Sequence, residues 1–190
     1  MRAPVGNFDS ATPAPEALDR LVGPVAEAVR AWNGPVPADQ LLYVDTDPEK
    51  ADTAVFVETY GDDLREASAN CVVVAAKQGG ERRLAACLVL PTTRADVNGV
   101  VRRHLGARKV SFAPMDTAVS ETGMEYGGIT PLGLPEGWPV LVDAAVAARP
   151  WVLIGSGGRR GKLIVPGKAL AGLPGAEVLE GLGVPLGGAS

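Results

Sequence analysis

The segment from Glu121 to Gly133 contains the residue types best suited to holding a ligand. Four glycines and one proline fall within its last eleven residues. Glycine accepts positive φ angles and lets a ligand approach main-chain N–H and C=O groups, and Pro131 stiffens the turn. We expect the Thr130 side chain to contact a ligand, with a hydrogen bond inside the turn as an equal alternative. For the loop as a whole, the alternative is an ordinary surface connection.

The side chains that most often carry catalysis are few in this sequence. The single histidine, His104, follows Arg102 and Arg103, so a solvated or RNA-facing role is favoured over that of a catalytic base. Ser156 has no His or acid at a recognisable triad spacing, which argues against a nucleophilic serine. Asp143 ends an apolar run, where it can cap the next turn or position a substrate amine.

Neither cysteine is expected to be reactive or to bind a metal. Cys71 and Cys87 lie in segments that we expect to be strands, where cysteine commonly packs as a small hydrophobic residue. No group of His and Cys residues has the spacing of a zinc site, so we expect neither a metal nor another cofactor.

Length and composition favour a single cytoplasmic domain. The chain has 190 residues, 46% of them hydrophobic, which is enough for one sizeable core. No apolar run reaches the roughly 18 residues of a membrane-spanning helix. The first residues have no apolar signal-peptide segment. We therefore expect a cytoplasmic protein without a membrane partner.

Positive charge is concentrated in the second half of the chain. The net charge is −4, which argues against a general nucleic-acid-coating protein, and we expect no DNA partner. Residues 1–93 carry 8 basic and 14 acidic side chains, whereas residues 94–190 carry 10 and 8. A polyanion could meet the basic residues of the second half, with scattered solvated charges as the alternative. The residues expected to face RNA are Arg102, Arg103, Arg159, Arg160 and Lys162.

The N-terminal third of the sequence predicts helices around one strand. Apolar residues recur at helical spacing over residues 15–33 and predict an amphipathic helix that Gly23-Pro24 bends or splits. Residues 40–44 are expected to form the first strand. Asp47 has the character of an N-cap and precedes a proline, which predicts a helix at about 48–60.

The remaining sequence predicts short strands mixed with helices. Two β-prone runs around a Gly-Gly turn predict a hairpin of residues 70–77 and 82–90. Further strands are expected at 109–112, 139–143, 151–155, 162–165 and 177–179, and further helices at 96–105, 115–122 and 166–172.

These elements lack regular βαβ alternation, which indicates an α+β fold. We expect a curved mixed β-sheet or a partly open barrel of about six or seven strands, flanked by about four or five helices. Residues 1–14 are expected to form a poorly ordered arm, and residues 181–190 a flexible tail. Residues 15–180 are expected to form a single domain with an added N-terminal helix.

The order of several motifs resembles a known family. Over roughly residues 48–180 it is similar to that of the YbaK-type aminoacyl-tRNA deacylases, which are relatives of the editing domain inserted in bacterial prolyl-tRNA synthetase. The ordered combination is more specific than any single motif. The motifs are Ala95-Asp-Val-Asn-Gly-Val-Val-Arg-Arg-His-Leu-Gly-Ala-Arg-Lys-Val-Ser-Phe-Ala-Pro114, Glu121-Thr-Gly, Gly127-Gly-Ile-Thr-Pro-Leu-Gly133, Pro139-Val-Leu-Val-Asp143 and Gly155-Ser-Gly-Gly-Arg-Arg-Gly161.

The resemblance implies hydrolysis of the ester between a mischarged amino acid and the terminal ribose of tRNA. It implies the acceptor end of aminoacyl-tRNA and an aminoacyl-tRNA synthetase as partners. In the family, the Gly-x-x-x-Pro loop, here Gly127 to Pro131, shapes the aminoacyl pocket, and the later glycine-rich turn, here Ser156 to Gly161, lies close by. The expected substrate-binding residues are Asn70, Gly127, Gly128, Ile129, Thr130, Pro131, Asp143, Ser156 and Gly157.

One departure concerns the family's main functional side chain, a lysine at the start of the central strand. The corresponding residue here is Asn70, a neutral amide that keeps hydrogen bonding but lacks the field of an ammonium. Losing one such group commonly costs about 100- to 1000-fold in rate. A weak deacylase and a catalytically silent binder of tRNA ends, aminoacyl-nucleotide-like ligands or a synthetase are therefore both open. A third possibility, a small-molecule ester hydrolase, lacks an identifiable nucleophile.

The sequence names no catalytic residue in place of the missing lysine. Lys77 lies at an odd offset from Asn70 and points to the opposite face of a regular strand. Lys162 or Arg159, arriving from the second glycine-rich turn, is the better candidate. The interpretation requires that residues 127–131 and 156–161 meet the start of the Asn70 strand around a single hollow.

Overall fold

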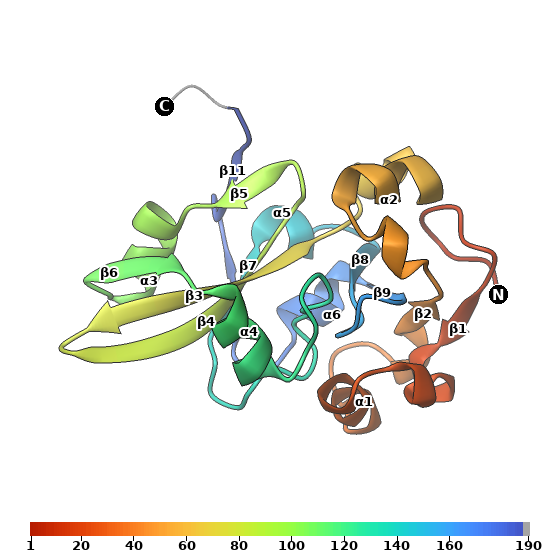
Figure 1. Cartoon of the computed structure of the whole chain (residues 1–190), viewed down its shortest axis with the longest axis horizontal. Coiled ribbons are helices and arrows are strands. Elements are labelled where there is room, and N and C mark those ends of the chain that lie inside the picture. Colours follow the sequence, from red (N-terminus) through yellow and green to blue (C-terminus); the bar gives the residue numbers. More distant parts are fainter. Residues whose placement is uncertain (188–190) are drawn as a thin grey trace.

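A computed structural model of the protein describes residues 1–187 (Figure 1). In this part of the chain, eleven strands form sheets of five, four and two strands. The two larger sheets lie side by side with helices around them, and they do not close into a barrel (Figure 1). The predicted α+β class is confirmed: the five-stranded sheet is mixed, the other two are antiparallel, and they form no partly open barrel.

The five-stranded sheet is built around a long hairpin. β3 (Asn70–Gln78) pairs along its whole length with antiparallel β4 (Glu81–Val89), and Gly79 and Gly80 between them both have positive φ angles. The tight hairpin turn whose twist matches the strands requires such angles, which glycine adopts without strain. Three strands complete the sheet: β6 (Lys109–Phe112), antiparallel to β3, β7 (Val140–Asp143), parallel to β4, and β10 (Ala176–Leu179), parallel to β7.

The four-stranded sheet brings the N-terminal region beside the second glycine-rich turn. β8 (Val152–Gly155) and β9 (Lys162–Val165) form the hairpin that was predicted around residues 156–161. The strands, in spatial order and all antiparallel, are β1 (Ala11–Pro13), β2 (Leu42–Val44), β9 (Lys162–Val165) and β8 (Val152–Gly155). A third sheet consists of β5 (Thr93–Ala95) and antiparallel β11 (Gly183–Pro185).

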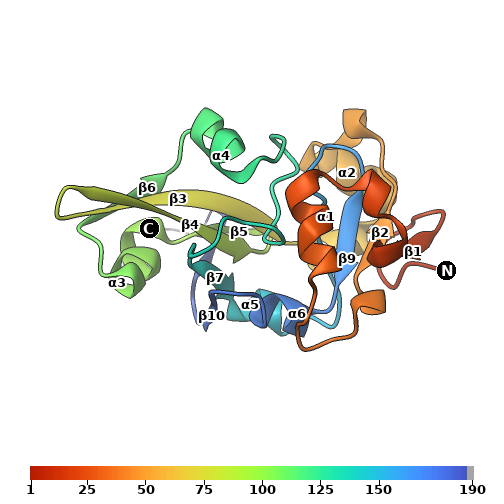
Figure 2. The same ribbon diagram turned by 90° about the horizontal axis from the view of Figure 1, so that it is seen from below.

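Helices cover both faces of the five-stranded sheet, which we call the central sheet. α4 (Met115–Thr122) lies on one face, and α3 (Arg102–Leu105), with the π-helical turn Val97–Val101 that precedes it, lies on the other (Figure 2). Asp96 caps this turn by accepting hydrogen bonds of 3.1 Å from the N–H groups of Gly99 and Val100. No helix of residues 1–187 is long and apolar enough to cross a membrane. The α-helices are α1 (Gly23–Arg30), α2 (Thr53–Tyr60), α3 (Arg102–Leu105), α4 (Met115–Thr122), α5 (Ala144–Ala147) and α6 (Gly167–Ala171).

Proline and aspartate decide where the first two helices begin. Gly23-Pro24 opens α1 and does not bend a longer helix, because the missing N–H of proline would have no partner in the first turn in any case. Two 3-10 turns occupy the preceding residues. The predicted helix at 48–60 is also divided, since Asp47 caps a 3-10 turn at Pro48–Lys50 and Asp52 caps α2.

Three apolar cores join these layers. The largest lies between the two main sheets and α1, and it includes Val25 and Leu163. The second fills the face of the central sheet under α3 and includes Val101. The third packs α2 on the four-stranded sheet through Phe56. The core between the sheets fixes where the ends of their strands meet, and the candidate site forms there.

Both ends of the chain are more regular than the sequence predicts. In the expected arm of residues 1–14, β1 pairs with β2 and Ala3 is buried. In the expected tail of residues 181–190, Leu182 is fully buried and β11 pairs with β5, while residues 188–190 lie outside the described residues. Strands of three residues are too short to show an alternating pattern, so the predicted number of strands was too low.

Candidate functional site

A cavity of about 380 Å³ opens where segments from distant parts of the chain meet. Asn70, Gly127 and Arg159 share this cavity, as the expected arrangement of the Asn70 strand and the two glycine-rich segments requires. The full set of lining residues is Ala51, Asp52, Thr53, Phe56, Val57, Ser68, Ala69, Asn70, Pro91, Tyr126, Gly127, Leu153, Ile154, Gly155, Arg159 and Lys162.

The two glycine-rich loops are in backbone contact beside the cavity. Gly157 N–H donates to the Gly128 carbonyl and Glu125 N–H donates to the Gly157 carbonyl, both at 2.8 Å. A Cβ atom on Gly128 would lie 2.3 Å from the Gly158 carbonyl oxygen, and one on Gly155 would lie 2.5 Å from the Gly128 carbonyl oxygen. Residues with a Cβ cannot approach so closely. These glycines therefore hold the two loops together.

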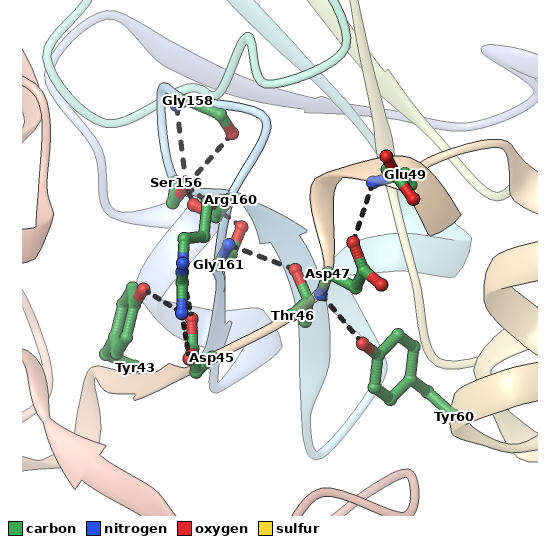
Figure 3. Close-up of polar contacts among 10 residues, drawn as sticks. All are labelled: Tyr43, Asp45, Thr46, Asp47, Glu49, Tyr60, Ser156, Gly158, Arg160 and Gly161. Atoms are coloured by element: carbon green, nitrogen blue, oxygen red, sulfur yellow. Dashed lines mark hydrogen bonds and ion pairs between the residues drawn. The ribbon is translucent and has the colours of Figure 1, made fainter.

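The second glycine-rich turn is also attached to the segment after β2 (Figure 3). Gly161 N–H donates to Thr46 Oγ1 at 3.0 Å, and Arg160 forms two hydrogen bonds of 2.9 Å with the Asp45 carboxylate. The hydrogen bond from Arg160 is the main reason why the pKa of Asp45 lies below its ordinary value. Buried Ser156 donates within the turn, 2.9 Å from the Gly161 carbonyl oxygen. Ser156 and Arg160 thus fix the shape of the turn.

Two cationic side chains reach the cavity from this turn and from β9. Lys162 Nζ donates to the Gly127 carbonyl oxygen at 3.3 Å and lies 5.8 Å from the centre of the Phe56 ring. Burial and, to a smaller degree, the charge of Arg159 lower the pKa of Lys162. Arg159 donates to the Pro48 carbonyl oxygen at 3.2 Å. An anionic group in the cavity would relieve this unfavourable concentration of positive charge.

Asn70 and Lys162 are available to the same ligand. Asn70 is the first residue of β3 and is exposed. Asp52, the one carboxylate among the cavity-lining residues, accepts a hydrogen bond of 3.1 Å from Ala54 N–H as the N-cap of α2. No histidine or cysteine lines the cavity. Charge stabilisation by Lys162 and Arg159 is thus the chemistry that the site offers most directly.

Thr130 and Asp143 do not line the cavity. Thr130 is fully buried, and its Oγ1 has no hydrogen-bond partner in the described part of the chain. Asp143 is 4% exposed, caps α5, and accepts a hydrogen bond of 3.1 Å from Gly183 N–H. Burial raises the pKa of Asp143. Both side chains are therefore buried away from the cavity, and Asp143 has the hydrogen-bond partners of a structural cap.

Five other expected substrate-binding residues also lie outside the cavity lining: Gly128 and Ser156, which hold the loops in shape, and Ile129, Gly157 and Pro131. Ile129 packs against the largest core. A Cβ on Gly157 would lie 2.3 Å from Val22 Cγ2, and the φ angle of Gly157 is positive. Pro131 lines a separate, mainly apolar groove of about 470 Å³ together with Trp32. The first glycine loop thus contributes to two different hollows.

The remaining expected residues fall into two groups. Arg159 and Lys162 line the cavity, whereas Arg102 and Arg103 lie on α3, which packs against a different sheet from β9 (Figure 2). Nε2 of His104, on the same helix, lies 2.9 Å from a carboxylate oxygen of Glu177. The α3 residues are therefore separate from the cavity.

Two aromatic residues contribute to the cavity, and both cysteines lie outside it. Tyr126 and Phe56 line the cavity but were not predicted. Tyr126 as a whole residue is 57% exposed, and an aromatic residue inside a glycine-rich loop was the signal that could have found it. Burial raises the pKa of the Cys87 thiol to about 12 and that of Cys71 further still, which fits their expected packing role.

Comparison with known proteins identifies the family. Residues 47–173 match the sequence profile of the aminoacyl-tRNA editing domain. One similar solved structure is a candidate trans-editing enzyme for prolyl-tRNA synthetase, with 20% identity, a TM-score of 0.68, and coverage of 86% of this chain and 95% of that chain. Another is a hypothetical protein, with 21% identity, a TM-score of 0.59, and coverage of 71% and 84%.

The structural matches, at these identities, establish the fold. The sequence profile extends over α2, Asn70 and both glycine-rich loops, and so over every segment that lines the cavity. The resemblance seen in the sequence is therefore confirmed. The chain belongs to the aminoacyl-tRNA editing domain family.

Proposed function

We propose that the protein is a trans-acting aminoacyl-tRNA deacylase that hydrolyses the ester of mischarged tRNA in the cytoplasm. The observation that carries this proposal is the single cavity in which Asn70, Gly127 and Lys162 meet. Membership of the editing-domain family supports it, as does the fold shared with a candidate trans-editing enzyme. We further propose that an aminoacyl-tRNA synthetase is a partner.

In the proposed reaction, water attacks the carbonyl carbon of the aminoacyl ester. The bond from that carbon to the ribose oxygen breaks, and the ribose hydroxyl leaves with a proton derived from the water. Negative charge develops on the carbonyl oxygen, and a preorganised positive group stabilises this charge most effectively. We assign that role to the Lys162 ammonium, assisted by backbone N–H groups of the first glycine loop. Asn70 supplies hydrogen bonds to the ribose end of the substrate.

The surroundings of Lys162 favour this role. Its ammonium is partly desolvated and lies near the charge of Arg159, and both effects lower its pKa. A cation in such a site interacts more strongly with a developing oxyanion than it would in water. The hydrogen bond to the Gly127 carbonyl oxygen also directs Nζ toward the first glycine loop.

The test is deacylation of a panel of mischarged tRNAs by the natural protein and by Lys162→Met. We expect the natural protein to hydrolyse at least one of them and the variant to lose about 100- to 1000-fold in kcat, because one transition-state charge partner is removed. Lys168→Met is the control, since Lys168 is exposed on α6 and lines no part of the cavity. Equal activity of Lys162→Met and the natural protein would contradict the assignment.

A second candidate function is catalytically silent binding of tRNA ends, aminoacyl-nucleotide-like ligands or a synthetase. Two observations favour it: Asn70 carries no charge, and the cavity-lining residues include no histidine. The same panel separates the two functions. Retention of tRNA without loss of any ester would establish binding and exclude the deacylase.

A further inference from the structure

The outer end of the β3–β4 hairpin carries a row of three exposed cations across three neighbouring strands. The register places Lys77 directly opposite Arg82 of β4 on one side and Lys109 of β6 on the other. Directly opposite residues have Cβ atoms about 4.5–5.5 Å apart and share one face of the sheet. Like charges in these positions are destabilising. We call Lys77, Arg82 and Lys109 the hairpin cation row.

Within residues 1–187, no ion pair neutralises this row or the neighbouring Arg108. All four cations line a concavity of about 620 Å³ at the hairpin tip, in which Glu81 is the one acidic residue. The lining therefore carries a net charge of +3 in a chain whose net charge is −4. The Gly79-Gly80 turn beside it has open space where Cβ atoms would be, so a large ligand can approach.

The hairpin cation row projects from a different face than α3. Ala76 and Val110, the strand neighbours of Lys77 and Lys109, pack in one core with Val101 of the π-helical turn before α3. Side chains alternate between the two faces along a strand. The row therefore points to the opposite face, on which α4 lies (Figure 2). It is distinct from the basic residues of α3.

We propose that the hairpin cation row binds phosphates of the tRNA acceptor stem while the 3′ end of the tRNA occupies the cavity. The inference rests on the proposed function, because that function is the reason for placing the 3′ end of the tRNA in the cavity. Asn70 and Lys77 lie in the same strand, β3, and their Cα atoms are separated by about 23 Å at a rise of ~3.3 Å per residue. An aminoacyl ester alone cannot span this distance, whereas an RNA chain can. Contacts to phosphates position an RNA without reading its sequence.

The test compares two RNA probes: a hairpin RNA of an acceptor stem that ends in single-stranded CCA, and the CCA trinucleotide alone. The variant replaces the row by Lys77→Thr, Arg82→Thr and Lys109→Thr, since threonine is well suited to strands. Dissociation constants are measured from low to moderate salt. We expect the variant to bind the hairpin RNA about tenfold or more weakly at low salt. The slope of log affinity against log salt should fall in magnitude by about 2 to 3, for three lost phosphate contacts.

Three measurements make the result specific. The variant should bind the CCA trinucleotide as the natural protein does, because the cavity is unchanged. Its thermal midpoint should be equal or higher, because like-charge repulsion across the strands is removed. Lys168→Thr is the single-charge control outside the row. It should change the salt slope by no more than the loss of about one phosphate contact would.

Three results would overturn the inference, and the first two differ in what they say of the proposed function. If the row variant keeps the natural slope for the hairpin RNA while mischarged tRNA is still hydrolysed, the surface is wrong and the deacylase stands. If the natural protein binds neither RNA probe and hydrolyses no mischarged tRNA, both are wrong. A loss in the Lys168→Thr control as large as that in the row variant would also exclude a localised site.

Discussion

At the residue scale, the candidate site depends on glycines because two backbones touch there. Gly128 and Gly155 lie so close to carbonyl oxygens of neighbouring segments that a Cβ would overlap with them. Side chains supply the charge: Lys162 and Arg159 both reach the cavity, and each also donates to a backbone carbonyl. The first glycine loop thus offers the candidate site its backbone groups, and the charge comes from the cations that approach it.

Thr130 allows a direct test of this division between backbone and side chain. Thr130→Val should leave deacylation unchanged and raise the free energy of unfolding by about 1 kcal/mol, because the buried hydroxyl has lost water without gaining a partner in the described residues. Chemical denaturation and the deacylation assay measure the two effects. A folded variant without activity would show that the hydroxyl contacts the substrate.

At the element scale, the residue directly before the last strand belongs to the core under α3. Leu182 is fully buried in the cluster under α3, directly before β11. Asp143 links the same region to β7 and α5, since its carboxylate caps α5 and accepts from Gly183 N–H. Burial raises the pKa of Asp143 above its ordinary value of 3.8. Its contribution to stability is therefore largest below pH 3.8 and decreases as pH rises through the raised value.

Leu182→Ala should therefore destabilise the fold although Leu182 lies only eight residues before the last residue of the sequence. We expect a loss of about 2–5 kcal/mol in the free energy of unfolding, the usual result of emptying a fully buried leucine site. Leu186→Ala is the matched control, because Leu186 is 58% exposed and should change stability by less than about 0.5 kcal/mol. Equal effects of the two substitutions in denaturant titrations would refute the placement of Leu182.

At the scale of the whole molecule, the N-terminal segment supports a wall of the cavity. Phe8 stacks on Tyr60 at the end of α2, with ring centroids 5.1 Å apart, and Phe56 of α2 contacts both rings. Gly6 N–H donates to Asp63 just beyond the helix at 2.9 Å. Phe56 also lines the cavity. Residues outside the 47–173 family match thus hold a helix that belongs to the candidate site.

Removal of residues 1–10 should loosen α2 and the cavity with it. We expect faster amide hydrogen exchange in α2 and weaker binding of the CCA trinucleotide, because the aromatic cluster loses Phe8. Amide hydrogen exchange in the β3–β4 hairpin should stay at its natural rate, because the hairpin pairs neither with residues 1–10 nor with α2. An α2 that keeps its protection after the deletion would show that the helix does not need the N-terminal segment.

The sequence predicted elements whose signals are local. The Gly-Gly hairpin, the helix at 96–105 and the α+β class follow from turn chemistry, apolar runs and spacing, and the structure confirms them. Where local signals are weak, the prediction was wrong or incomplete. β1, β5 and β11 have three residues each and form because a neighbouring strand offers hydrogen bonds.

The sequence by itself determined the family and the segments that form the candidate site, because glycine spacing and motif order are properties of the chain. Only the tertiary structure decided which side chains face the cavity. Thr130 and Lys162 both lie in or beside glycine-rich segments, yet packing buries the hydroxyl of the first and leaves the ammonium of the second in the cavity. The register of β3 between β4 and β6 likewise places Lys77 between two further cations. The physical reason is that contacts between residues far apart in the chain set the orientation of side chains and the pairing of strands. No local sequence pattern contains these contacts.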